Sequence, residues 1–300
     1  MRDILLPDLN LIRSMKLKFS KTFHNSSFLN LYKIIAICMP LLFYVSLKQV
    51  MADISFAGVV SPPRFELQGK PGDVIRNVVL IGNDALKPAH YHIRTADWDL
   101  DEQYGVVIHP PELQPDSCRP WTRIERRELK LAPQQNRKFR FEIKIPEDAK
   151  TGECRLAILV EQTTESAVTL SVGNDIQIPL TGRLGVIIYV KVGDAQPKLE
   201  FQEIGLSDVN GRMLPVAMIR NTGNAHGRPV GIIEGTDNNK QFLEFIVSPR
   251  AILPGETRAI PLTPASPEDP QKTAEFTLPL KLKGPIEWEH GKFDLDVILQ

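Results

Sequence analysis

Two cysteines, Cys118 and Cys154, carry the most definite chemistry in the chain outside its first fifty residues. Their thiols could bind a metal, take part in redox exchange or form a disulfide. A redox role favours the short Cys-x-x-Cys spacing, and a zinc site needs further ligands; neither accompanies this pair. In an exported protein two such cysteines most often pair. We therefore predict a Cys118–Cys154 disulfide, provided that the chain is exported.

Two other groups of side chains have the residue types of metal sites. His90 and His92 would lie on one face of a strand, where two imidazoles can bind zinc, but no third ligand stands at a typical spacing. The acidic run 97–102 lacks the glycine and the terminal glutamate of a calcium-binding loop. We expect exposed or partly packed histidines and a solvated loop, with no metal and no cofactor.

Signals of catalysis are missing from the sequence. It contains no Gly-x-Ser-x-Gly elbow, P-loop, His-Glu-x-x-His motif or dinucleotide fingerprint. The mixed charge run 123–128 is typical of an exposed, salt-bridged strand or turn. The whole chain has a formal net charge of zero, but residues 1–52 hold seven Lys/Arg and two Asp/Glu, which leaves the rest at −5. The sequence thus predicts a protein that is not an enzyme and has no bulk charge for nucleic acid.

The first fifty residues have the pattern of a secretory leader. An apolar stretch from Ile34 to Val45 follows a lysine-rich segment, and Val50-Met51-Ala52 supplies the small or tolerated residues of a cleavage site. The apolar stretch is about a dozen residues long, shorter than the ~20 that span a bilayer. We predict a signal peptide over residues 1–52, cleaved after Ala52, with Met1 or Met15 as its start. An uncleaved anchor is the alternative.

After the leader, a phrase of strands and turns occurs twice. In each copy an alternating strand ends in asparagine, at Asn83 and at Asn221. A Pro turn and a second alternating strand follow, at 131–145 in the first copy and 253–262 in the second. This order is typical of antiparallel sandwiches. Asp194–Pro197 is the best linker. We predict an all-β protein of two immunoglobulin-like β-sandwich domains, 53–193 and 198–300.

The strands of the first copy place apolar residues at every second position. The strand 138–145 should bury one such face, and the strand 154–161 another. The segment 176–192 is long and apolar and breaks near Pro179 and Gly185. It holds two alternating sets, which are Ile176, Ile178 and Leu180, and then Leu184, Val186 and Ile188. Either set could pack the protein's own core or be offered to a partner.

These features together resemble the PapD-like periplasmic pilus-assembly chaperones. The resemblance rests on paired sandwiches, on Arg64 early in the first one, and on an apolar last strand, 182–190, that ends near Tyr189. In that family the last strand of the first domain lends alternating apolar side chains to an incomplete pilin subunit. The resemblance implies a partner site that includes Arg64, Ile176, Ile178, Leu180 and Arg183.

The chain departs from the family at one position. The family anchors the pilin carboxylate with an Arg on the first strand and a Lys inside the last strand. Arg64 matches the first, but Gly185 or Val186 stands where the Lys is expected. Arg183 or Lys191 could substitute, although neither has the expected spacing.

The resemblance implies a periplasmic chaperone-like or accessory protein of pilus or fimbrial assembly. Its partners would be pilin-like or other β-rich envelope subunits, and possibly an usher. The alternative is a structural or adhesive envelope module with immunoglobulin-like domains and no chaperone activity.

Overall fold

A computed structural model describes residues 57–163, 168–172, 176–180, 182–265 and 273–300 of the chain, and for 168–172 and 176–180 it describes the backbone alone. The predicted leader and its cleavage site lie outside these residues. Within the described ranges no helix has the length and apolar character needed to cross a membrane. Residues 54–300 form one compact unit. The boundaries 53–193 and 198–300 remain a prediction about domains that fold separately.

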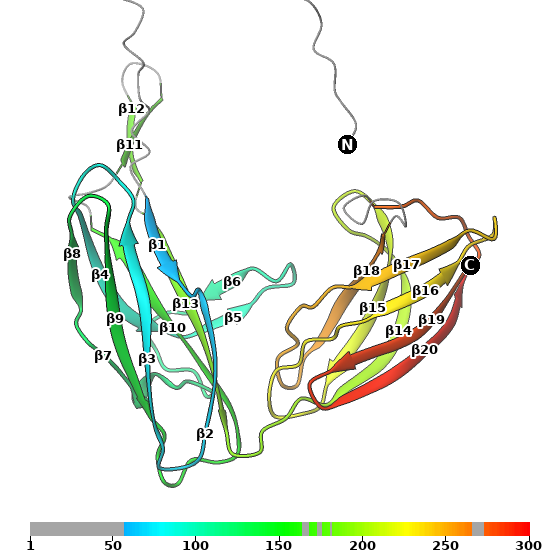
Figure 1. Cartoon of the computed structure of the whole chain (residues 1–300), viewed down its shortest axis with the longest axis horizontal. Coiled ribbons are helices and arrows are strands. Elements are labelled where there is room, and N and C mark those ends of the chain that lie inside the picture. Colours follow the sequence, from blue (N-terminus) through cyan, green and yellow to red (C-terminus); the bar gives the residue numbers. More distant parts are fainter. Residues whose placement is uncertain (1–56, 164–167, 173–175, 181, 266–272) are drawn as a thin grey trace, which may run out of the picture. The chain divides into compact units, whose positions relative to one another are not determined.

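The N-terminal sandwich consists of two facing sheets (Figure 1). The first has the order β1-β3-β9-β7 and the second the order β2-β13-β10-β4-β8. Their strands are β1 (Gly58–Ser61), β2 (Arg64–Gly69), β3 (Val74–Asn83), β4 (Ala89–Ala96), β7 (Thr122–Ile124), β8 (Glu128–Leu131), β9 (Gln135–Lys144), β10 (Gly152–Gln162) and β13 (Arg183–Val192). All pairs are antiparallel except β2–β13, which is parallel.

Smaller elements complete this half of the chain. They are the hairpin of β5 (Trp98–Leu100) and β6 (Val106–Ile108), the 3₁₀ helix η1 (Arg119–Trp121), and the pair β11 (Val168–Val172) and β12 (Ile176–Leu180). Among the described strands, β11 and β12 pair only with each other.

The C-terminal sandwich is built from one seven-stranded sheet of order β14-β15-β18-β17-β16-β19-β20. Its strands are β14 (Leu199–Asp208), β15 (Met213–Asn221), β16 (Ile232–Thr236), β17 (Phe242–Val247), β18 (Thr257–Ala265), β19 (Leu280–Trp288) and β20 (Gly291–Leu299). β18 pairs with β15 over Thr257–Pro261 and with β17 over Leu262–Ala265. The change of partner folds the sheet around its own core. The predicted fold class, two immunoglobulin-like β-sandwiches, is confirmed.

The predicted alternation of β9 is confirmed, because its apolar face, together with Ile145, is buried in the N-terminal core. The prediction for β10 was incomplete. Leu156, Ile158 and Val160 fill the core as expected, but Ala157 and Leu159 on the opposite face are also buried. That second face packs against a cluster that includes Trp98 and Tyr189. A strand covered on both faces is continuously apolar.

The repeated asparagine has the same structural role in both copies. The Asn83 side chain donates to the carbonyl oxygens of Lys87 and Ala132, at 2.8 and 3.0 Å. Asn221 donates to the carbonyl oxygens of Ala225 and Ile252, both at 2.8 Å. Each side chain is buried and holds the loop after its strand against the Pro turn of the same sandwich. The phrase therefore marks a loop anchor, because a buried amide must satisfy its donors.

The predicted disulfide joins Cys118 to Cys154, with the Cα atoms 5.3 Å apart. It ties η1 to β10 beneath the core, where both sulfurs are buried. The metal and calcium interpretations were rejected from the sequence, and the described residues contain no group of three or more ligands that could hold a metal ion.

We expect replacement of both cysteines by serine to lower the free energy of unfolding by about 4 kcal/mol, because the bridge closes a loop of 36 residues. Denaturant unfolding of the exported protein, with and without reductant, measures this. Complete labelling of both thiols in unreduced protein would contradict the bridge.

Candidate partner-binding site

The first half of β13 has a strand on one side only. β13 pairs with β10 along its whole length, from the pair Arg183 and Glu161 to the pair Val192 and Gly152. Its other neighbour, β2, begins only at the Ile187–Arg64 pair. Within the described strands, nothing pairs with Arg183–Val186 on that side, and β12 likewise pairs only with β11. Unpaired backbone groups in an extended chain are a template for a further strand.

The two apolar sets of this region have different outcomes. Val186 and Ile188 are fully buried and Leu184 partly so, and all three pack in the N-terminal core. This second set therefore belongs to the protein's own interior. Ile176, Ile178 and Leu180 lie on β12, but their side chains fall outside the described residues. Their role in binding remains a prediction.

Arg64 begins β2 and lines a cavity of about 380 Å³. Its Nε lies 3.2 Å from Oε1 of Glu66, and about half of its side chain is exposed. Arg228, from the C-terminal sandwich, lines the same cavity and contacts the same Glu66 oxygen at 3.4 Å. The Arg228 guanidinium lies over the Tyr189 ring, 5.7 Å from its centre, and donates to the Tyr189 hydroxyl at 3.4 Å. The cavity thus presents two further cations, Arg228 and Arg250, that the sequence did not indicate.

Arg183 and Lys191 do not line this cavity. The Nε of Arg183 lies 2.7 Å from Glu161, and Arg183 faces a different cavity on the N-terminal sandwich. Lys191 forms an ion pair with Glu289. The structure therefore brings Arg64 together with Arg228, and not with either of the cations that the sequence suggested as substitutes.

A buried ionic contact lies next to the cavity. His226 Nδ1 lies 2.6 Å from Oε2 of Glu153, and its Nε2 lies 3.6 Å from Oε1 of Glu66. The His226 ring stacks on Tyr189 with 4.0 Å between centres. His226 and the Glu153 side chain are both almost fully buried. These contacts join β2, β10 and β13 to the loop that precedes β16.

The environment shifts two of these ionisations. Burial opposes protonation of His226, but hydrogen bonding with Glu153 and Glu66 outweighs it and raises the pKa of His226 above its ordinary value. Hydrogen bonding from His226 is the largest effect on Glu66 and, against the cost of burial, lowers its pKa to about 2. At neutral pH Glu66 is therefore ionised and contacts both Arg64 and Arg228, although it does not itself line the cavity.

The β5–β6 hairpin adds a second contact between the two sandwiches. The Tyr104 hydroxyl donates to the carbonyl oxygen of Ala259 at 3.0 Å. Arg258 donates to the carbonyl oxygens of Leu100 and Asp101, and both Arg250 and Arg258 lie over the Tyr104 ring. Burial raises the pKa of Tyr104 to about 12, so its hydroxyl stays a donor.

Sequence reasoning missed Arg228, His226 and Tyr104 because no local pattern distinguishes them. Each acquires its role from a contact with a residue more than 35 positions away. The sequence did mark Tyr189, as the end of an apolar strand, but not its contacts with His226 and Arg228.

No family model and no curated protein matches the chain. Among solved structures, the chain is similar to one from a chaperone–tip adhesin complex of CFA/I fimbriae biogenesis, with 12% identity, a TM-score of 0.43, and coverage of 81% of this chain and 99% of that one. It is also similar to the Pseudomonas aeruginosa CupB2 chaperone, with 8% identity, a TM-score of 0.41, and coverage of 81% and 100%. A third similar structure comes from the CsuC–CsuE chaperone–tip adhesion subunit pre-assembly complex of Acinetobacter baumannii. It has 9% identity and a TM-score of 0.41, and the match covers 82% of this chain and 100% of that one. Likeness at this level is not evidence for a shared function.

We expect His226→Gln to lower the free energy of unfolding by about 3 kcal/mol below pH ~6.5, because it leaves Glu153 buried without its cation. A histidine with a raised folded pKa stabilises fully below its unfolded pKa, and this stabilisation is lost as the pH rises through the folded value. The difference from wild type should therefore shrink at higher pH. Denaturant unfolding across this range measures it, with His290→Gln, an exposed histidine, as control. A difference independent of pH would contradict the assignment.

Proposed function

We propose that this protein is a periplasmic chaperone-like or accessory protein of pilus or fimbrial assembly, and that it holds β-rich subunits by strand addition. The observation that carries the proposal is the free side of β12 and of Arg183–Val186 in β13. A partner that lacks a strand would pair with this edge through its backbone, and the side chains of Ile176, Ile178 and Leu180 would enter its groove. No cofactor and no catalytic step are needed.

The cavity at Arg64 supports an anchoring role beside that edge. Arg64 is the first residue of β2 that pairs with β13, and its partner there is Ile187. A partner strand that ran along Arg183–Val186 would end near this pair. Guanidinium groups bind carboxylates through two parallel hydrogen bonds. We propose that Arg64 and Arg228 together bind the carboxylate that ends the partner chain, in place of the Arg and Lys expected from the family resemblance.

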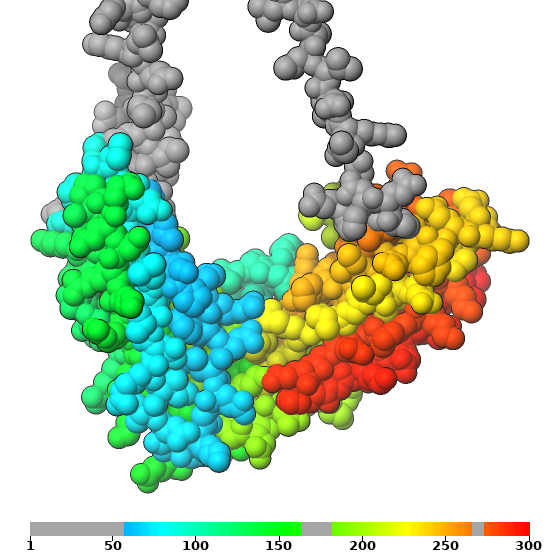
Figure 2. All heavy atoms as spheres, in the orientation of Figure 1, coloured from blue at the N-terminus to red at the C-terminus, as the bar shows by residue number. Residues whose placement is uncertain are grey.

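One observation favours the alternative of an adhesive envelope module. On the outer face of the C-terminal sheet the neighbouring strands β16 and β17 expose large apolar side chains, as does β20, which β19 separates from them; these strands appear yellow to red in Figure 2. Ile232 and Ile246 are cross-strand partners and are 56% and 43% exposed, and Ile298 is 61% exposed. Exposed apolar patches often mark contact surfaces. If this face binds the partner, changes at β12 will have no effect on capture.

The partner is identified by placing a photoreactive amino acid at position 178 of the exported protein and cross-linking in the envelope. Met213, 55% exposed on the C-terminal sandwich, is the matched control position. We expect cross-links from position 178 to a β-rich subunit and none to that subunit from position 213.

With that subunit in hand, we expect Ile178→Asp to weaken its capture by about tenfold or more, because an apolar contact is replaced by a buried charge. Arg64→Ala should weaken capture less, because Arg228 remains in the cavity. Affinity of the purified subunit for each variant measures both effects.

A comparison of two variants distinguishes loss of folding from loss of partner capture. Val186→Asp places a charge at a fully buried position and should lose folded protein, whereas Ile178→Asp should be exported and folded with its disulfide intact. Loss of soluble protein from Ile178→Asp would mean that β12 belongs to the protein's own core. Equal capture by wild type, Ile178→Asp and Arg64→Ala would refute the strand-addition site.

A further inference from the structure

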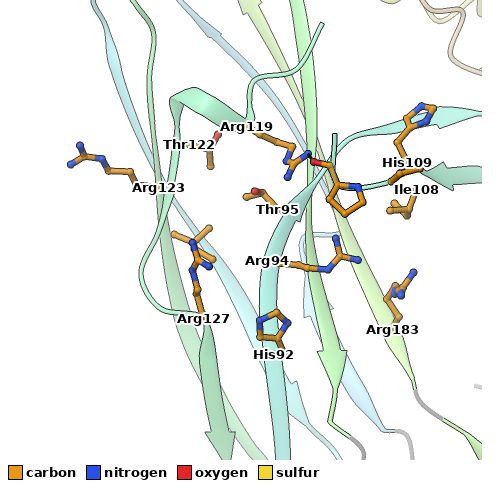
Figure 3. Close-up of a pocket in the computed structure, with 13 residues that line it drawn as sticks. His92, Arg94, Thr95, Ile108, His109, Arg119, Thr122, Arg123, Arg127 and Arg183 are labelled. Atoms are coloured by element: carbon orange, nitrogen blue, oxygen red, sulfur yellow. Dashed lines mark hydrogen bonds between the residues drawn. The ribbon is translucent and has the colours of Figure 1, made fainter. Parts of the chain in front are cut away.

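A second cavity, of about 930 Å³, is lined by five arginines from separate parts of the N-terminal sandwich, one of which is Arg123 on β7. Arg94 lies on β4, Arg119 in η1, Arg127 between β7 and β8, and Arg183 at the start of β13. Figure 3 shows these side chains around one opening, with His92 and His109 on its wall, while Arg123 points away from the others. No acidic side chain of the described part of the chain lines the cavity. The assembly shares Arg183 with the proposed strand-addition edge, but its other arginines lie outside that edge.

Nearby carboxylates neutralise only part of this charge. Glu161 receives both Nε and Nη2 of Arg94, at 3.1 and 3.0 Å, and also pairs with Arg183. Burial opposes its ionisation, but the hydrogen bonds from Arg94 outweigh this and lower the pKa of Glu161. Asp97 receives Nη1 of Arg119 at 3.1 Å. Two carboxylates thus face four guanidinium groups.

The other described carboxylates near the cavity do not neutralise its remaining arginines. Glu128 lies opposite His92 in the β4–β8 pairing, but it is exposed and does not line the cavity. Asp99 lies 3.8 Å from His109. Arg127 forms no ion pair with any described residue and is exposed. Among the described residues, the arginines of the cavity therefore outnumber the carboxylates that pair with them.

One of these arginines also has a buried donor with no acceptor among the described residues. The Nε of Arg119 is buried and has no hydrogen-bond partner in the described part of the chain. Arg183 contacts Glu161 through its Nε, and 54% of its side chain is exposed. Buried donors without acceptors are costly, so such a group indicates an acceptor that is absent from the protein itself.

The chemistry of this donor set favours a multiply charged oxyanion. The Glu161 carboxylate already contacts both Arg94 and Arg183. A ligand with a single negative charge would neutralise only one of the arginines that lack a carboxylate partner. A phosphate group offers three or more acceptor oxygens, and guanidinium forks match its geometry. We propose that this cavity is a binding site for a phosphate-bearing ligand, a phosphomonoester or diphosphate.

The test is calorimetric titration of the folded, disulfide-bonded protein with pyrophosphate, and with acetate as the singly charged comparison. Wild type should bind pyrophosphate with at least about tenfold higher affinity than acetate. Arg127→Gln with Arg183→Gln should weaken pyrophosphate binding about tenfold or more, since a hydrogen bond to a charged group contributes about 1.5–3 kcal/mol and each 1.4 kcal/mol is tenfold. This pair of changes leaves the Arg94–Glu161 and Arg119–Asp97 contacts in place.

The matched control is Arg212→Gln with Arg220→Gln, two exposed arginines of the C-terminal sandwich that remove the same charge. Control protein should bind pyrophosphate as wild type does. No measurable binding to wild type, or equal weakening in both double variants, would overturn the proposal.

A second arm distinguishes the source of the phosphate. Vesicles that contain phosphatidic acid, whose headgroup is a phosphomonoester, present the group on a lipid surface, and phosphatidylcholine vesicles are the neutral comparison. Binding to these vesicles that is lost in the cavity variant and retained in the control supports a lipid headgroup. Pyrophosphate binding without vesicle binding supports a free phosphate ligand.

Discussion

The pairing of β13 is the constraint on which the rest of this structure depends. β10 covers one side of the strand along its length, whereas β2 covers the other side only from Ile187 onward. The covered half fixes Ile188 and Val190 in the core and turns Tyr189 toward the C-terminal sandwich. The other half, Arg183–Val186, pairs with β10 alone among the described strands. One strand thus fills the core at one end and has an unpaired side at the other, where strand addition is proposed.

Tyr189 connects this strand to the rest of the molecule. One side of its ring stacks on His226, and its edge meets Trp98 at 5.2 Å between ring centres. Beneath it, His226 and Glu153 form a buried ionic contact, which contributes stability only when both partners are in place. The same group fixes Glu66 between Arg64 and Arg228. The anchoring cavity is therefore formed by the contacts that hold the two sandwiches, and not by one strand alone.

Local patterns predicted much of the fold. Alternation located β9 and β10, and the repeated asparagine phrase marked equivalent corners of the two sandwiches, because a buried amide after a strand has few other uses. The cysteine pair was predicted from the number of cysteines and from the predicted export of the chain. These inferences succeed because each depends on residues close in sequence or on a simple count.

The candidate sites depend on contacts that no local pattern reveals. Arg228 meets Glu66 across 162 positions, and the arginines of the phosphate cavity come from strands and loops spread over about 90 residues. Arg183 was predicted for a partner site beside Arg64, but it faces the second cavity and pairs with Glu161. A sequence gives the charge of such residues without giving their neighbours, which the sheet order decides.

Hydrogen–deuterium exchange of the protein alone and in complex with its captured subunit tests strand addition most directly. Strand addition predicts that backbone amides of Ile176–Leu180 and Arg183–Val186 become protected in the complex, while β10, already paired on both sides, stays unchanged. Protection on the outer face of β16, β17 and β20 with unchanged exchange in β12 and the start of β13 would contradict it.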